Sequence, residues 1–230
     1  MVRLCLFDCD GTLVDSQHAI IAAMGSAFAV QGLPPAADDK VRSVVGLPLK
    51  SAIALLLPEG ATANIDQLAE AYSGAYGALR RQGPLAEPLF AGVIETLDAI
   101  AERGWLLGIA TGKSYRGALA TLESHGLTGR FCTIQTADSG ATKPDPDMIL
   151  NALRETGADA SRAVMIGDTA YDMIMARRAH ARPLGVAWGY HGEEQLWSAG
   201  AERVVHAFPE IAAVLDDWFA DETTPERYGR

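Results

Sequence analysis

Residues 4–16 read LCLFDCDGTLVDS, and this stretch sets the expectation for the fold of the chain. Its first four residues are apolar without polar alternation, which is typical of a strand buried on both faces of a parallel sheet. Asp8 and Asp10 follow at once and lead into a turn at Gly11. Burying two unpaired anions is costly, so we expect a cation beside them. Carboxylate and backbone oxygens suit Mg²⁺, although a strand that simply ends in an acidic turn is the alternative.

Similar apolar runs recur along the chain, and each is followed by a stretch of helical spacing. The predicted strands are residues 4–7, 106–110, 133–135, 163–166 and 184–187. Strands that alternate with helices indicate right-handed crossovers and a doubly wound parallel sheet. We therefore predict an α/β fold with a Rossmann-like core, whose ligands bind beyond the carboxyl ends of the strands.

One segment interrupts this alternation. Between Gln17 and Gly83 the pattern is only helical, over residues 18–31, 39–45, 49–57 and 65–82. We expect a small helical domain, 17–83, inserted into a discontinuous core of 1–16 and 84–220. The polar end, 221–230, is predicted to be a loose tail.

Two further strand ends carry groups that suit phosphate. Thr111 and Gly112 follow the strand at 106–110, where a hydroxyl and free backbone N–H groups can hold phosphate oxygens. The simpler alternative is that Ser114 caps the next helix. Lys143 lies in the sequence KPDP, and the prolines stiffen the backbone around it, which makes it a candidate fixed cation. A surface turn with an incidental lysine is the competing interpretation.

The last of these strand ends is again acidic. The strand at 163–166 ends at Gly167 and delivers Asp168 and then Asp172. The alternative is that Asp168 or Thr169 caps the next helix. Capping accounts for one of the two aspartates, but less readily for both. The acid pair, hydroxyl, lysine and second acid pair occur in chain order, at strand ends that a parallel sheet would bring together.

This combination resembles the four motifs of the haloacid dehalogenase-like superfamily, in particular its phosphoglycolate phosphatase-like branch. The likeness covers nearly the whole chain, including a helical cap inserted after the first motif. It implies a phosphatase that uses Mg²⁺ and transfers the phosphoryl group of a small phosphate monoester to Asp8 and then to water.

The resemblance also implies a role for each site residue. Asp8 is the nucleophile, and Asp10 is the general acid and base. Thr111 and Lys143 bind and neutralise the phosphoryl group, with help from the backbone at Gly11 and Gly112. The implied metal ligands are the Asp8 carboxylate, the Asp10 backbone carbonyl and Asp168, with Asp172 as a ligand or as a support for the metal or the lysine.

The same fold supports several other activities. Dehalogenation is disfavoured, because that branch lacks an acid at the position of Asp10. A β-phosphoglucomutase-like phosphomutase stays open, as does a phosphonate hydrolase, which would need a cap lysine such as Lys40 or Lys50 in a motif that this chain does not show. A regulatory binding protein without turnover is the non-enzymatic alternative, and the intact set of site residues argues against it.

Substrate choice is expected to depend on the cap, because it closes over the core. Arg42, followed by VGLPL at 45–49, is the most distinctive cap stretch and is similar to caps of the phosphoglycolate phosphatase-like branch. Arg42 is therefore a candidate for binding a substrate carboxylate, with a solvated helix arginine as the alternative. Phosphoglycolate is one candidate substrate.

Composition limits the other partners. The chain holds 19 basic and 29 acidic residues, a formal charge of −10, so neither a nucleic acid nor an anionic membrane is an expected partner. Its three cysteines are too few for a disulfide framework, and no apolar segment is long enough to cross a membrane. We predict a cytoplasmic enzyme that acts on a small molecule as a monomer or homodimer.

Overall fold

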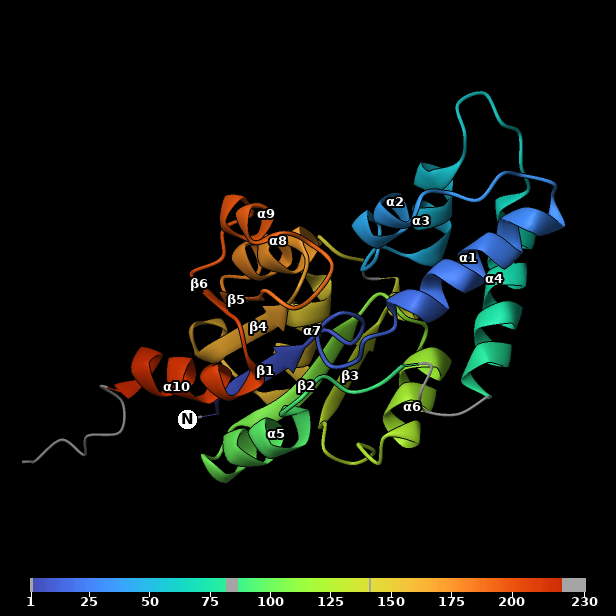
Figure 1. Ribbon diagram of the computed structural model, residues 1–230. Helices are drawn as coiled ribbons and strands as arrows, with labels where there is room; N and C mark the ends of the chain where they lie inside the picture. Colours follow the sequence, from blue (N-terminus) through green and yellow to red (C-terminus); the bar gives the residue numbers. More distant parts are fainter. Residues whose placement is uncertain (1, 82–86, 141, 221–230) are drawn as a thin grey trace, which may run out of the picture.

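The core of the protein is one parallel sheet. The computed structural model describes residues 2–81, 87–140 and 142–220, and all statements below concern these residues. Six parallel strands lie in the order β3-β2-β1-β4-β5-β6. Their bounds are β1 Leu4–Phe7, β2 Leu106–Thr111, β3 Thr133–Thr136, β4 Ala163–Gly167, β5 Arg182–Val186 and β6 Arg203–Val205. The predicted α/β fold with a doubly wound parallel sheet is confirmed (Figure 1).

Helices cover both faces of this sheet, as the apolar strands require. Cys5 and Phe7 of β1 belong to a core cluster with helices α5 (Val93–Glu102) and α10 (Phe208–Trp218). Leu4 and Leu6 belong to a second cluster, with α7 (Asp147–Thr156) and α8 (Ala170–Arg178). Alternate residues of β1 therefore face opposite layers of helices. Both layers are apolar, which explains why the strand sequence has no polar alternation.

The remaining core elements lie around the edges of the sheet. Helix α6 spans Tyr115–Ser124 and precedes β3, and α9 spans Glu193–Ser198 between β5 and β6. Short 3-10 turns occur at Ala137–Ser139 and Ala160–Arg162. The edge strand β6 has only three residues, begins with an exposed arginine and was not predicted from the sequence.

The segment between β1 and α5 contains only helices among the described residues. These are α1 Gln17–Val30, α2 Asp38–Ser43, α3 Leu49–Leu56 and α4 Ile65–Arg80. They share a hydrophobic cluster of their own, built around Met24, Phe28, Ile53 and Leu68, and they stand beside the carboxyl-end side of the sheet (Figure 1). We propose that these helices form the inserted cap. The predicted boundary between the cap and the core, at 83/84, and the predicted tail at 221–230 lie outside the described residues.

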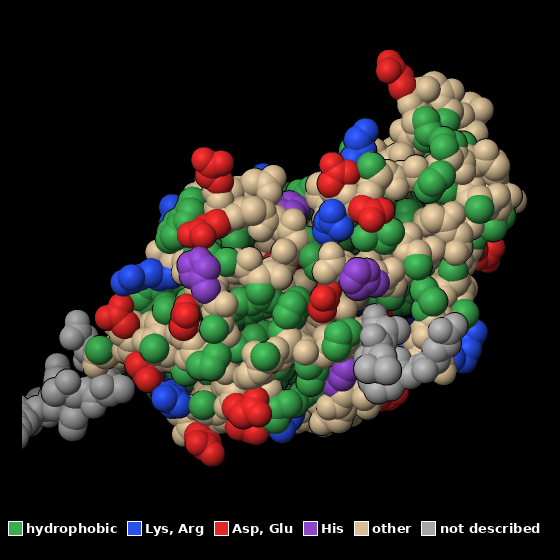
Figure 2. Space-filling view, viewed as in Figure 1, with side chains coloured by type: hydrophobic (Ala, Val, Ile, Leu, Met, Phe, Trp, Pro, Cys, Tyr) green, Lys and Arg blue, Asp and Glu red, His purple; other side chains and the backbone are tan. Residues whose placement is uncertain are grey.

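The surface is mixed in charge. Figure 2 shows acidic and basic side chains interspersed with apolar ones over the visible face, on the sheet domain and on the cap helices. No helix in the described ranges is both long enough and apolar enough to span a bilayer.

Candidate active site

The three buried aspartates of the site come from two neighbouring strand ends. Asp8 follows β1 directly, and Asp168 follows β4 directly. The two strands are paired in register, and the Asp8 N–H donates to the Ile166 carbonyl at 2.9 Å. Asp172 lies one helical turn further, in α8. One carboxylate oxygen of each aspartate lies within 4.8 Å of the others, so the sheet does bring these predicted residues together.

Glycines make room for this acidic cluster. Gly11 has a φ of +78°, and a Cβ there would lie 2.2 Å from Asp168 Oδ2. A Cβ on Gly189 would lie 2.1 Å from the Asp168 Cβ. No side chain fits at such distances, so both turns approach Asp168 closely only because the residues are glycine. The backbone N–H of Tyr190 donates to Asp168 Oδ2 at 2.9 Å, and the Thr12 hydroxyl donates to Oδ1 at 2.8 Å.

Lys143 is the buried cation of the cluster. Its Nζ lies 2.9 Å from Asp8 Oδ1 and 2.6 Å from Asp172 Oδ1, and its side chain is fully buried. Burial alone would lower the lysine pKa, but Asp172 and Asp8 outweigh it and raise the pKa above its usual value. Lys143 is therefore a fixed ammonium inside the site, as its stiff sequence context predicted, and not an incidental surface lysine.

Asp172 serves the helix and the site at once. Thr169 is the N-cap of α8, and its backbone N–H and hydroxyl both lie close to Asp172 Oδ2, at 3.1 and 2.7 Å. The other oxygen, Oδ1, faces Lys143. The capping interpretation is thus correct for Thr169, and it orients a carboxylate that also holds the lysine.

The charge balance of the cluster leaves room for one more cation. Burial raises the pKa of Asp8 to about 7, against the opposing effect of Lys143 and with help from Asp172. Burial, Asp8 and Asp172 together raise the pKa of Asp168 well above its usual value. Asp8 Oδ2 is buried and has no hydrogen-bond partner in the described chain. Three carboxylates beside one ammonium leave the cluster with excess negative charge, which fits a hard divalent ion with oxygen ligands.

The strand β2 ends at the hydroxyl side chain of Thr111 and continues into a turn at Gly112. Thr111 is its last residue, is 1% exposed, and accepts a hydrogen bond from the Lys113 N–H at 3.3 Å. A Cβ on Gly112 would lie 2.6 Å from the carbonyl oxygen of Gly46 in the cap. The cap loop therefore packs directly on this turn. Ser114 caps α6 by accepting from the Gly117 N–H at 3.2 Å, so the predicted helix cap is present as well.

Asp10 is held by neighbours that the sequence did not indicate. Its Oδ1 lies 2.8 Å from Lys113 Nζ, and it also accepts a short hydrogen bond from the Ser16 hydroxyl. Lys113 in turn contacts Tyr76 of the cap helix α4, with 3.1 Å between Nζ and the phenolic oxygen. Lys113 directly follows Gly112, but no periodicity of the sequence indicates a partner 37 residues earlier in a helix.

A cavity of about 1390 Å³ opens above these groups, between the sheet and the cap. Asp8, Asp10, Thr111 and Gly112 line its floor, and most of the remaining lining comes from the cap helices α1–α4 and from α6. Arg42 is half-buried in α2 and is not among the lining residues. The geometry brings together every other predicted site residue that carries a functional side chain, and it does not bring Arg42 to them.

Comparison with known proteins agrees with this site. The haloacid dehalogenase-like hydrolase family model matches residues 5–186. The chain belongs to that family. A probable phosphatase, IndB of Dickeya dadantii, is 34% identical over 99% of this chain and 100% of its own. A phosphoglycolate phosphatase of Agrobacterium fabrum is 36% identical over 81% of both chains. A solved hydrolase from Pseudomonas syringae has a TM-score of 0.82 at 29% identity, covering 94% of this chain and 99% of that one.

These relatives confirm the resemblance to the phosphoglycolate phosphatase-like branch of the family. They also confirm the class of activity, because a family of hydrolases and relatives that are named phosphatases make this chain a phosphatase. The acidic triad is in keeping with a divalent metal, which phosphatases of this family use.

Proposed function

We propose that this protein hydrolyses a small phosphate monoester with Mg²⁺, through a phosphoryl intermediate on Asp8. The observation that carries the proposal is the convergence of Asp8, Asp168, Asp172 and Lys143 in one buried cluster, with Asp8 on the floor of a large cavity. A buried acidic cluster with one fixed ammonium is expensive to maintain, and phosphoryl transfer requires such a centre to offset charge.

The nucleophile is Asp8 Oδ2. Asp8 Oδ1 accepts from the Cys9 N–H at 2.7 Å and pairs with Lys143, which fixes the orientation of the carboxylate. Oδ2 has no hydrogen-bond partner among the described residues, so it is the oxygen that is free to attack phosphorus. Lys143 and the Thr111 hydroxyl stabilise the negative charge of the phosphoryl oxygens as the bond to the leaving group breaks.

The metal site uses residues of the same cluster. Asp8, Asp168 and the backbone carbonyl of Asp10 would hold Mg²⁺, with Asp172 supporting Lys143. When bound, the ion offsets charge on the phosphoryl group and on the attacking carboxylate.

Asp10 is the general acid and base. In the first step its carboxyl group gives a proton to the departing alcohol, and in the second its carboxylate takes a proton from the water that hydrolyses the aspartyl phosphate. Its contacts with Lys113 and Ser16 hold it beside the cavity.

The central test is hydrolysis of p-nitrophenyl phosphate by the purified chain. We expect turnover with Mg²⁺, none after treatment with EDTA, and recovery when Mg²⁺ is restored. Asp8→Asn should abolish turnover while circular dichroism and thermal unfolding show an intact fold. The exposed Asp39→Asn is the matched control and should behave as the wild type. Undiminished turnover by Asp8→Asn would reject the nucleophile.

Phosphoglycolate is the first candidate substrate, because a relative of 36% identity is named a phosphoglycolate phosphatase. Binding of its carboxylate by Arg42 stays a prediction from the sequence, and the position of Arg42 outside the cavity lining does not favour it. A panel of phosphoglycolate, sugar phosphates and nucleotides would identify the preferred substrate. A cytoplasmic location and a monomeric or homodimeric state also stay predictions.

A further inference from the structure

Lys113 is a second buried cation in the cavity, apart from the acidic triad. It follows the end of β2, its side chain is 9% exposed, and it lines the cavity next to Asp10. Its ammonium has Asp10 Oδ1 at 2.8 Å and the Tyr76 phenol at 3.1 Å, and it lies 4.8 Å from the centre of the Tyr76 ring. The cap and the sheet domain therefore fix the position of Lys113 from two sides.

This ammonium retains a free donor. An ammonium group has three N–H bonds, and two of them are accounted for by Asp10 and Tyr76. For the third, the described residues provide no acceptor. The contact of Lys113 with the Asp10 carboxylate is an ion pair, so the remaining N–H belongs to a charged donor. A charged N–H that borders a cavity is a site for an anionic acceptor.

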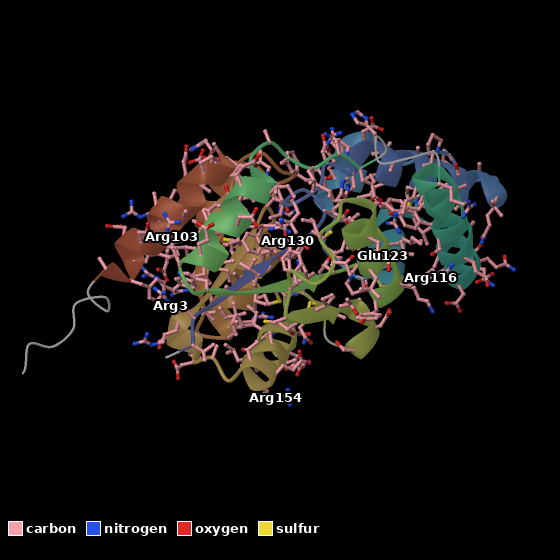
Figure 3. All side chains as sticks on the ribbon, turned by 90° about the horizontal axis from the view of Figure 1, so that it is seen from below. Arg3, Arg103, Arg116, Glu123, Arg130 and Arg154 are labelled. Carbon is pink, nitrogen blue, oxygen red and sulfur yellow. The ribbon has the colours of Figure 1, made fainter. Side chains whose placement is uncertain are left out.

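Further cations line the same cavity. Arg80 and Arg81 end the cap helix α4 and Arg116 begins α6, and all three border the cavity with Lys113. Figure 3 shows Arg116 on α6, at the end nearest the cap helices. Arg80 is paired with Glu87 at 3.1 Å, whereas Arg81 and Arg116 have no ion pair within the described part of the chain. In a chain of charge −10, this grouping of cations favours an anionic ligand.

We propose that Lys113 is a specificity-determining residue that receives an anionic group carried by the leaving group of the substrate. The inference rests on the proposed phosphatase function. Asp10 must contact the ester oxygen to protonate it, and Lys113 contacts Asp10 directly. An anion a few bonds from the ester oxygen therefore comes within reach of the Lys113 ammonium.

The proposal defines a class of substrates. They are phosphate monoesters whose alcohol bears a carboxylate or a second phosphate close to the ester oxygen. Both groups offer the charged oxygen acceptors that an ammonium binds, and a cavity of about 1390 Å³ has room for either. Neutral alcohols of the same size lack this contact and should be poorer substrates.

The same contact gives the substrate an effect on Asp10. In the free protein, Lys113 and Ser16 hold the Asp10 carboxyl group. A substrate anion bound to the third N–H of Lys113 shares the ammonium with Asp10 and weakens one of these two contacts. Asp10 is then freer to turn toward the ester oxygen, so an anionic leaving group helps to place its own acid.

The test compares substrates that differ only in the anion. We would measure kcat and KM for phosphoglycolate, for 2-hydroxyethyl phosphate and for the bisphosphate of ethylene glycol. In the wild type the anionic esters should be preferred, and whichever of the two is better identifies the anion. In Lys113→Met the ratio of kcat/KM for the anionic ester over the neutral ester should fall by about 10- to 100-fold, beyond any loss that both esters share because the contact with Asp10 is removed.

Two variants separate this role from a structural one. Lys113→Arg keeps the charge and should retain most of the preference, and Lys40→Met removes an exposed cap lysine outside the cavity lining and should change nothing. Equal losses on charged and neutral esters in Lys113→Met, with Lys113→Arg no better, would overturn the proposal.

A binding measurement keeps the outcome independent of turnover. In an Asp8→Asn background, calorimetry should show that Lys113→Met weakens the binding of phosphoglycolate more than the binding of 2-hydroxyethyl phosphate. If the wild type bound anionic and neutral esters equally, the proposal would be wrong even though the protein is a phosphatase. If the wild type hydrolysed no phosphate ester but bound the anionic ones selectively, the proposed function would fail and the Lys113 subsite would stand.

Discussion

At the scale of single residues, the position of Asp10 decides how the leaving group is protonated. Asp10→Asn removes the acid and leaves a side chain of nearly the same size. We expect hydrolysis of an alkyl phosphate to fall by about 10²–10⁴-fold, because an alkoxide leaves poorly without a proton. An aryl phosphate should lose much less, because its phenolate leaves more readily. Parallel kinetics on the two esters measure the difference, and equal losses would remove the acid role from Asp10.

Gly189 is a second residue on which the site depends. An alanine Cβ there would overlap Asp168, so Gly189→Ala must displace the Asp168 side chain or the turn that holds it. We expect a loss of about 10- to 100-fold in activity or metal affinity, as for other changes that disturb the support of a metal ligand. Mg²⁺ titrations of the activity provide the measurement.

Gly25 provides the matched control for this change. It lies within α1, and a Cβ there would meet no atom within 4 Å. Gly25→Ala should keep full activity and stabilise the helix by about 0.5–1 kcal/mol. A Gly189→Ala protein as active as Gly25→Ala at limiting Mg²⁺ would show that the close approach to Asp168 is dispensable.

At the scale of elements, a histidine joins the cap to the sheet domain. His191 accepts from the Ala170 N–H at 3.1 Å through Nδ1, and its Nε2 lies 3.2 Å from the carbonyl oxygen of Ser43 at the end of α2. An N–H on one side and a carbonyl on the other fit the neutral ring, with its proton on Nε2. Burial lowers the pKa of His191, so the folded protein resists protonation of this ring.

This arrangement predicts a pH dependence of stability. Below the unfolded histidine pKa of about 6.5 the unfolded chain takes up a proton that folded His191 refuses, so this residue reduces the free energy of unfolding as pH falls. Asp8 acts in the opposite direction, because its pKa is raised in the folded state. The measurement is therefore a difference: urea unfolding of wild type and His191→Gln at pH 7, 6 and 5. The wild type should lose more stability than the variant on acidification, and parallel curves would contradict the assignment.

The elements also show what the sequence could predict. β1 and β4 were predicted almost to the residue because both faces of these strands are buried, which leaves an unbroken apolar run. β5 begins two residues earlier than predicted, at Arg182, because Arg182 and Pro183 pair with β4 although they add no apolar run. β6 escaped prediction because three residues with one side chain exposed carry no apolar pattern.

At the scale of the whole molecule, the acidic cluster predicts that bound Mg²⁺ raises the free energy of unfolding. Buried carboxylates that repel one another destabilise the native state, and an ion that binds only this state adds stability by mass action. At a Mg²⁺ concentration of about one hundred times Kd, the gain is about 2.7 kcal/mol, or a rise in Tm of about 5–10 °C for a chain of this size. Differential scanning calorimetry with and without Mg²⁺ checks this expectation.

Asp168→Asn is the informative variant for this measurement. It removes one charge of the cluster, so the metal-free protein should unfold at a higher temperature than the wild type, and the shift on adding Mg²⁺ should shrink. A full shift in Asp168→Asn would mean that Mg²⁺ binds elsewhere.

Only part of the site could be predicted from the sequence. Asp8, Thr111, Lys143 and Asp168 could be predicted because each directly follows a strand or a stiff turn, and a parallel sheet gathers strand ends at one edge. The contact between Lys113 and Tyr76 could not, because it joins the sheet domain to a cap helix whose placement no local pattern specifies. Arg42 was selected on its neighbours in sequence, and its position relative to the cavity depends on how α2 packs.

Cys9 lies between the two aspartates of the first motif and is 1% exposed, and burial raises the pKa of its thiol far above the usual range. Cys5 is buried as well, whereas Cys132 is exposed. A maleimide dye should therefore attach to Cys132 alone in the native enzyme, without touching the reaction centre. Such a labelled protein would allow domain movement to be followed by fluorescence without first removing the native cysteines.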